Sequence, residues 1–157
     1  MRSKIFVSYS HKDAKWLELF RTHMKVLENE GAAVDLWDDT KIKAGMKCRE
    51  EIEKALKETK VAVLLVSTEF LASDFVNKYE LPRLLKAAED EGATIISLIL
   101  KPCRFMEHKG LSQFQAINDP ERPLIKMSGV NRDSLLVTLV GRIEELIKQE
   151  ERFDRRR

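Results

Sequence analysis

The chain has 157 residues, of which 43% are hydrophobic, so it is long enough to bury the core of a single domain. Its 28 lysines and arginines nearly balance its 26 aspartates and glutamates, and the resulting net charge of +2 argues against a nucleic-acid-binding surface. The longest apolar run, Val61 to Val66, is much shorter than the roughly 20 residues that span a membrane. Because no signal-peptide pattern follows Met1, we expect a cytoplasmic protein without a membrane partner.

Cysteine and histidine spacing predicts neither a metal site nor a disulfide framework. Cys48 and Cys103 are far apart and form no CxxC pair. The histidines, His11, His23 and His108, are scattered and show no metal-ligand spacing. We therefore expect no metal and no cofactor, and we interpret the histidines as surface residues or as side chains satisfied by local contacts.

The first half of the chain alternates strand and helix patterns. A short apolar run predicts a first strand over residues 5–9, and the helix after it begins at the capping-box pattern of Ser10 and ends at Gly31. A second strand is expected over residues 33–37. After a polar loop, apolar residues at helical spacing predict a second helix over residues 48–59.

The second half continues the alternation. Residues 61–66 are apolar without a period of two, which is typical of a central parallel strand covered by helices on both faces. A helix is predicted over residues 73–89, and Pro82 should kink it or confine its regular part to the residues that follow. Strands are expected over 95–100 and, more briefly, over 124–127. The last helix has an apolar face formed by Leu135, Leu136, Leu139, Val140, Ile143, Leu146 and Ile147.

Strands alternating with helices predict an α/β fold with a parallel sheet and right-handed crossovers. Five such units suit a flavodoxin-like doubly wound five-stranded sheet of order 2-1-3-4-5, flanked by helices. In that order the chain reverses direction between strands 1 and 3, and ligands bind there, beyond the carboxyl ends of the strands. The residues expected at this place are Ser8, Tyr9, Ser10, Ser67 and, on the helix that follows, Glu80.

Several ligands that are common in this fold are excluded by the residues at the strand ends. The segment from Ser8 to Lys12 contains no glycine, so it cannot form a dinucleotide-binding GxGxxG turn. A phosphate-binding Walker A sequence is also missing, and the ends of strands 1 and 3 lack the acidic groups of a phosphorylated receiver domain. The side chains left at the strand ends as candidates for ligand binding are polar and aromatic.

These groups carry different expectations. Tyr9 and Trp37 each close a strand, where a ring could stack on a flat ligand, although Trp37 could equally pack under its own loop. Asp38 and Asp39 fit a turn-capping role. Glu80 lies in a segment expected to be partly buried, where a carboxylate costs free energy unless it is paired or used.

Taken together, these segments resemble the TIR (Toll/interleukin-1 receptor) domain, most closely its bacterial type. The resemblance is carried by the segments Ile5–Ser10, Trp37–Asp39, Ile42–Gly45, Val63–Ser67, Phe70–Phe75 and Tyr79–Pro82. It covers about residues 4–147 of a single TIR-like domain that takes up the chain 1–157. We expect the charged end after residue 150 to be a tail or a junction to another module, such as a sensor.

The resemblance implies two alternative functions. Many bacterial and plant members cleave NAD+ at the nicotinamide–ribose bond, giving nicotinamide and ADP-ribose or a cyclic ADP-ribose. On this interpretation Glu80 is the catalytic residue, self-assembly activates the domain, and the setting is bacterial antiviral defence. Many animal members only assemble with other TIR domains, and then the chain is a non-enzymatic adaptor in signalling or in interference with a host. A transferase of NAD-derived nucleotides is a third alternative.

The resemblance also implies which residues surround Glu80. Substrate-binding residues would be Ser8, Tyr9, Ser10, Trp37, Asp38, Ser67, Phe75, Val76 and Tyr79. An assembly loop would comprise Asp39, Lys41, Ile42, Lys43 and Gly45. Val76 stands where several bacterial members place a stacking tryptophan, four residues before the glutamate. The stacking ring would then come from Tyr9, Phe75 or Tyr79, or from a neighbouring protomer.

Overall fold

The computed structural model describes the backbone of residues 2–155 and the side chains of residues 2–149. Over this part of the chain, four strands form one parallel sheet in the order β2-β1-β3-β4. The strands are β1 (Lys4–Ser8), β2 (Leu36–Trp37), β3 (Thr59–Val66) and β4 (Thr94–Ile99). The predicted α/β fold with a parallel sheet is confirmed. β1 has neighbours on both sides, as a doubly wound order requires.

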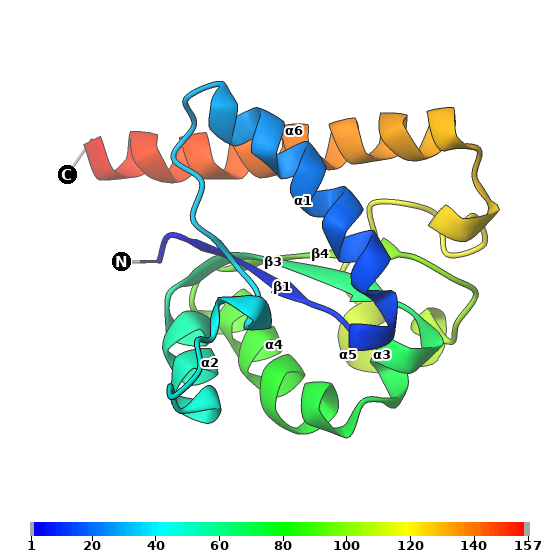
Figure 1. The fold of residues 1–157 in the computed structure, drawn as a ribbon, viewed down its shortest axis with the longest axis horizontal. Helices are drawn as coiled ribbons and strands as arrows, with labels where there is room; N and C mark the ends of the chain where they lie inside the picture. Colours follow the sequence, from blue (N-terminus) through cyan, green and yellow to red (C-terminus); the bar gives the residue numbers. More distant parts are fainter. Residues whose placement is uncertain (1, 156–157) are drawn as a thin grey trace.

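Helices connect the strands and cover both faces of the sheet. The α-helices are α1 (Ala14–Asn29), α2 (Cys48–Lys57), α3 (Thr68–Ala72), α4 (Leu81–Asp90), α5 (Lys109–Ser112) and α6 (Gly129–Arg155). The short turns are η1 (His11–Asp13), η2 (Asp39–Lys41), η3 (Val76–Glu80), η4 (Phe105–Glu107) and η5 (Leu124–Lys126). Figure 1 shows α1 and α6 on one face of the sheet and α2 to α5 on the other.

Alternation along β1 divides the core between the two faces. Ile5 and Val7 point into the cluster shared with α1 and α6, whereas Phe6 points into the cluster shared with α2 and α4. On β3, every residue of Val61–Val66 is fully buried. Its lack of alternation therefore reflects helices on both faces, which confirms the prediction of a central strand.

The apolar face predicted for the last helix is confirmed on α6. Leu136, Leu139, Ile143 and Leu146 are buried, and the other three predicted residues are half-buried against the same cluster. The helix crosses the sheet beside α1 (Figure 1). The backbone of α6 continues to Arg155, but the charged side chains from residue 150 onward lie outside the described residues.

The prediction of a fifth strand over residues 124–127 is wrong. The segment instead forms the single 3₁₀ turn η5, closed by hydrogen bonds from Lys126 N–H to Pro123 O and from Met127 N–H to Leu124 O, both 3.0 Å. Beside the end of β4, both backbone groups of Ile99 bond the side chain of Asn118 at 2.9 and 3.0 Å, and Ile125 N–H bonds Leu100 O at 2.9 Å without adding a strand to the sheet. The order is therefore 2-1-3-4 without the predicted strand 5.

The second strand is also shorter than predicted. Only Leu36 and Trp37 of the expected range 33–37 pair with β1, opposite Ile5 and Phe6. In the described part of the chain, β2 is an edge strand and pairs only with β1. Its length is therefore the number of residues over which these two strands run alongside each other.

Two further findings concern membrane spans and metal sites. Among the described residues, no helix combines the length and the apolar character that a membrane crossing requires. Within the same residues, histidine, cysteine, aspartate and glutamate side chains do not gather in threes around a possible metal position.

Candidate functional site

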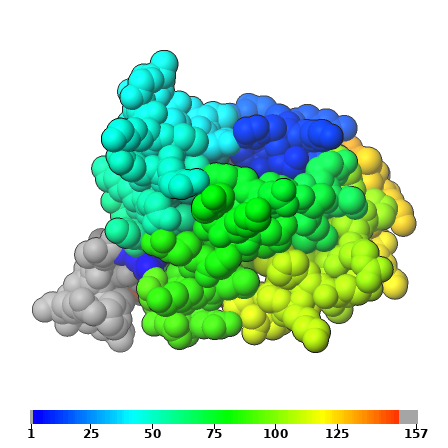
Figure 2. Space-filling model, turned by 90° about the horizontal axis from the view of Figure 1, so that it is seen from below, coloured from blue at the N-terminus to red at the C-terminus, as the bar shows by residue number. Residues whose placement is uncertain are grey.

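A cleft of about 460 Å³ opens beyond the carboxyl end of β1. Its lining residues are Val7, Tyr9, Ser10, His11, Lys12, Asp39, Cys48, Ile52, Ser73, Phe75, Val76 and Glu80. They come from the end of β1, from η1 and η2, from α2 and from the segment around η3. In Figure 2 the blue, cyan and green segments that supply these residues meet on one face. The volume lies within the range of ligand-binding pockets, about 300 to 1,000 Å³.

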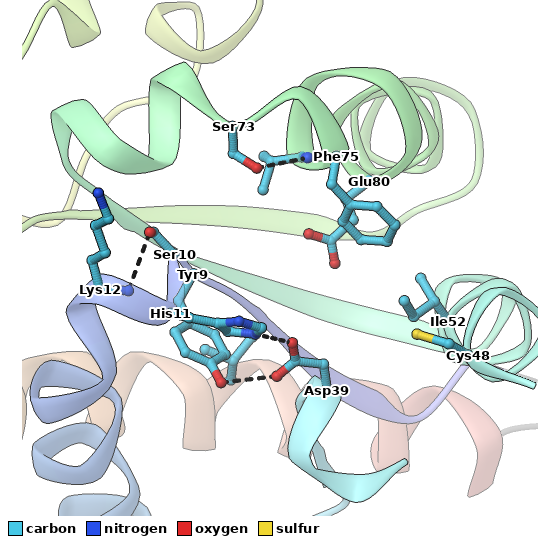
Figure 3. A pocket seen from close by; sticks show the side chains of 12 residues that line it. Tyr9, Ser10, His11, Lys12, Asp39, Cys48, Ile52, Ser73, Phe75 and Glu80 are labelled. Carbon is cyan, nitrogen blue, oxygen red and sulfur yellow. Dashed lines mark hydrogen bonds and ion pairs between the residues drawn. The ribbon is translucent and has the colours of Figure 1, made fainter. Parts of the chain in front are cut away.

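Glu80 forms one wall of this cleft, and its carboxylate projects toward the opposite wall (Figure 3). Glu80 is 7% exposed, and Ser8 Oγ donates a hydrogen bond to Glu80 Oε1 at 2.9 Å. Burial raises the pKa of Glu80 to about 7, since removal from water penalises the charged form. The hydrogen bond from Ser8 lowers this pKa, the charge of Asp39 raises it and His11 lowers it. The group therefore titrates near neutrality.

The backbone around Glu80 is a π-helix, within the segment 73–89 for which the sequence predicted a helix interrupted or confined by Pro82. In η3 the N–H of Leu81 bonds the carbonyl of Val76, five residues back. Pro82 explains this wider turn, because it has no N–H and its ring would clash with the carbonyl of Lys78 in an α-helix. Regular helix resumes in α4, with Pro82 in its first turn. Of the two effects predicted for this proline, confinement of the regular helix is confirmed.

Three side chains form a hydrogen-bonded group on the wall opposite Glu80 (Figure 3). The hydroxyl of Tyr9 donates to Asp39 Oδ1 at 2.8 Å, and His11 Nε2 lies 2.5 Å from Asp39 Oδ2. Burial and the hydrogen bond to Asp39 raise the pKa of Tyr9, so this phenol stays a proton donor. Both oxygens of Asp39 are engaged.

Asp38 holds the turn that presents Asp39. Its carboxylate is fully buried, accepts a hydrogen bond from Thr40 N–H at 2.9 Å and pairs with Arg21 at 2.6 Å. Burial opposes ionisation of Asp38, but the hydrogen bonds from Arg21 and Thr40 prevail and hold its pKa below the usual value. The turn-capping role expected for Asp38 is confirmed, and its side chain lies behind the loop rather than in the cleft.

The structure brings part of the predicted substrate-binding set together. Tyr9, Ser10, Phe75 and Val76 line the cleft with Glu80. Ser8 is buried directly behind the carboxylate that it bonds. Asp39, which was expected in the assembly loop, also lines the cleft.

Three other predicted residues lie outside the cleft lining. Trp37 is buried and stacks on Phe6 with ring centroids 5.0 Å apart, which is the packing role considered as its alternative. Ser67 donates to Asp13 at 2.5 Å and accepts from the first turn of α3. Tyr79 is 40% exposed and bonds Arg49 at 3.1 Å.

The remaining residues of the predicted assembly loop lie at the end of η2 and directly after it. Lys41, Lys43 and Gly45 are exposed, and Ile42 packs partly onto the core cluster of α2 and α4. Gly45 has a φ of +89°, a conformation that side chains other than glycine rarely adopt.

Sequence reasoning missed several cleft residues. His11 and Lys12 directly follow the predicted Ser8–Ser10 segment, so their position after the strand was an available signal. Cys48 and Ile52 come from α2, and their approach to β1 depends on helix packing that local patterns do not encode.

Comparison with known proteins agrees with this geometry. A family model of the TIR domain matches residues 5–123. An uncharacterized protein, y4lF, from Sinorhizobium fredii (strain NBRC 101917 / NGR234) is similar, with 26% identity over 133 residues, or 85% of this chain. The chain spans 41% of the length of that relative. Since the family model covers well over half of the sequence and both cleft walls, this chain belongs to the TIR-domain family.

Proposed function

We propose that this domain is an NAD+ glycohydrolase in which Glu80 is the catalytic group. The observation that supports the proposal most strongly is a nearly buried carboxylate, 7% exposed, that points into a cleft at the carboxyl end of the central strand β1. Such a carboxylate costs folding free energy, and groups of this kind concentrate at functional sites.

The chemistry requires little beyond a placed negative charge. When the bond between nicotinamide nitrogen and ribose C1′ breaks, its electron pair stays on nitrogen, and the pyridinium leaves as neutral nicotinamide. Positive charge then develops on the ribosyl group. Glu80 stabilises this charge electrostatically in a site with little water, where such an interaction is strongest. Water attack on C1′ gives ADP-ribose, and attack by the adenine of the same molecule gives a cyclic product.

Other lining residues suit the remaining parts of the substrate. Phe75 lies beside Glu80 in Figure 3 and is 41% exposed, so its ring is available to stack on nicotinamide in place of a tryptophan at Val76. The ammonium of Lys12, at another wall of the cleft, suits the pyrophosphate. Ser10 offers a hydroxyl beside it.

Self-association would complete the site. Two exposed apolar side chains lie at the cleft: Phe75 lines it, and the ring of Tyr79 lies 5.3 Å from that of Phe75. Burying them against a second domain would exclude water from the cleft and strengthen the electrostatic contribution of Glu80. A fused or separate sensor module would then trigger assembly, as in antiviral signalling.

The test is a concentration series of the purified protein with NAD+, with and without a crowding agent, in which chromatography follows nicotinamide release. We expect release to rise faster than linearly with protein concentration. Glu80→Gln keeps the shape of the side chain but removes its charge, so release should fall by at least about 100-fold. Glu89→Gln is the matched control, because Glu89 is exposed on α4 and should be replaceable without effect.

Two results would contradict the proposal. Full activity in a folded Glu80→Gln variant would exclude Glu80 as the catalytic group. No release at any concentration, together with co-assembly with other TIR domains, would favour the adaptor function instead. The same chromatogram separates linear ADP-ribose from its ring-closed isomers.

A further inference from the structure

The wall that faces Glu80 contains a histidine–aspartate pair that the cleavage step does not use. Asp39 Oδ2 lies 2.5 Å from His11 Nε2, while Asp39 Oδ1 accepts the hydroxyl proton of Tyr9 at 2.8 Å. An ionised carboxylate only accepts hydrogen bonds, so His11 donates through Nε2–H. In the neutral imidazole with this tautomer, the other ring nitrogen, Nδ1, carries the lone pair.

The pair is held in place before any ligand binds. Tyr9 follows directly on β1, and its ring lies 5.5 Å from that of His11. Asp39 begins η2, whose start is fixed by the buried carboxylate of Asp38. In histidines that act as bases, a carboxylate hydrogen-bonded to one ring nitrogen fixes the orientation of the ring and its tautomer. His11 is thus oriented by two elements, the end of β1 and the turn η2.

We propose that His11 is the general base for the second step, removing a proton from the water that attacks the ribosyl group, and that Asp39 positions it. This inference rests on the proposed NAD+ cleavage. The water oxygen donates an electron pair to C1′, and a C–O bond forms. One water proton moves to Nδ1 of His11, giving an imidazolium beside the carboxylate of Asp39. The side chain of His11 is 77% exposed, so the proton can pass from it to solvent.

The two steps place different demands on the protein. Nicotinamide leaves as a neutral base and takes no proton, so bond cleavage depends on Glu80 and not on His11. Nicotinamide returning to C1′ also needs no proton removal. Water, in contrast, must lose a proton when it adds, and a positioned base accelerates such a transfer by about 10² to 10⁴. Loss of His11 should therefore slow hydrolysis and spare nicotinamide exchange.

The experiment measures both reactions in one tube. The full chain is incubated with NAD+ and isotopically labelled free nicotinamide, at a protein concentration that gives maximal release. Exchange is the label entering NAD+, and hydrolysis is the ADP-ribose formed. For His11→Ala we expect hydrolysis to fall by about 100-fold and exchange to stay within about twofold. His11→Gln, which keeps a polar side chain but cannot take a proton, should behave in the same way.

Two further variants test the pairing. Asp39→Asn should lower hydrolysis by about tenfold with exchange retained, and Asp39→Glu should restore part of the loss. His23→Ala is the matched control, because His23 also meets a carboxylate, that of Asp133 at 3.4 Å, but does so between α1 and α6, outside the cleft lining. Its ratio of exchange to hydrolysis should equal that of the unchanged protein.

The outcomes separate the two proposals. If the unchanged protein shows neither exchange nor hydrolysis, NAD+ cleavage itself is wrong and the role of His11 falls with it. If the unchanged protein shows both, and His11→Ala and His11→Gln lose both equally or neither, the base assignment is wrong and Glu80 is untouched. A lower ratio of hydrolysis to exchange in both variants, with normal melting temperatures, supports the assignment.

Discussion

At the scale of single residues, Glu80 combines opposing influences on one carboxyl group. Burial and the charge of Asp39 favour its protonated form, whereas the hydrogen bond from Ser8 and the proximity of His11 favour its ionised form. The result is a pKa of about 7, where the group is readily converted from one form to the other. A cationic nicotinamide riboside beside it would shift this balance toward the carboxylate.

Cleavage of NAD+ should therefore depend on pH in a defined direction. The proposed mechanism requires ionised Glu80, and the ionised fraction rises as the pH increases through about 7. We expect kcat/KM to increase by about tenfold from pH 6 to pH 8, because kcat/KM reports on the free enzyme. Initial rates at low NAD+ concentration would measure it. A profile that falls over this range would contradict a role for the carboxylate.

The same pKa predicts a stability effect. The carboxyl group of a glutamate in the unfolded chain ionises near 4.5, but in the folded protein it ionises only near 7. Its contribution to stability is therefore fully present below about pH 4.5 and is lost as the pH rises through 7. Glu80→Gln removes this loss and should raise the free energy of unfolding by up to about 3 kcal/mol at pH 8, with little change at pH 4.5. Urea unfolding at both pH values would test it, and equal changes at both would refute it.

At the scale of elements, the π-helix η3 determines where Glu80 points. It joins the short α3 to α4, and its wider ring of backbone atoms shifts the helical register just before Pro82. A π-turn inside a helical segment is a feature that often accompanies functional sites. Here it places a carboxylate over the end of β1, where Ser8 bonds it.

Replacement of Pro82 should disturb this placement. In Pro82→Ala a backbone N–H becomes available to the carbonyl of Lys78, which favours a regular α-turn and moves Glu80 relative to Ser8. We expect the helical content to be kept and kcat for NAD+ cleavage to fall by about tenfold or more, because displacements near 1 Å are enough for such losses. Lys86→Ala, an exposed change on α4, is the control. Unchanged kcat in Pro82→Ala would show that the π-turn is not required.

At the scale of the whole molecule, the two faces of the sheet carry different tasks. The face under α1 and α6 is a packed apolar layer with Leu136, Leu139 and Ile143 fully buried. The opposite face, with α2 and the segment of η3, contributes side chains to the cleft. Stability and catalysis can therefore be perturbed separately.

A truncation in the α6 layer tests this separation. Leu139→Ala leaves a cavity in a fully buried position and should lower the free energy of unfolding by about 3 kcal/mol, with a melting temperature lower by about 6 to 12 °C. Its kcat per folded molecule, measured well below the transition, should match that of the unchanged protein. Val137→Ala on the same helix is the control, since Val137 is 62% exposed and should shift stability by less than about 0.5 kcal/mol. A matching loss of kcat would show that the faces are coupled.

Local patterns in the sequence determined the parts of the fold that depend on neighbouring residues. The strand at Val61–Val66 could be predicted because burial on both faces makes every position apolar. The last helix could be predicted because burial of one stripe makes apolar residues recur at the helical period. The parallel sheet then places Ser8 at a ligand-binding edge, and Glu80 was expected beside it. The prediction failed where several local solutions compete. Residues 124–127 close a 3₁₀ turn and meet the end of β4 through the bond from Ile125 N–H to Leu100 O, while Asn118 bonds Ile99.

Only the tertiary structure decided which side chains share the cleft. His11 and Asp39 are 28 residues apart in sequence, and their contact requires the turns after β1 and β2 to lie side by side. Cys48 and Ile52 reach the same cleft because α2 packs against the sheet. Trp37 turns into the core onto Phe6 for a related reason, since the register of two paired strands determines which face a side chain meets. Composition and periodicity report on the structure of one segment at a time. The cleft depends on how far apart side chains from different segments lie, and the packing of those segments sets these distances.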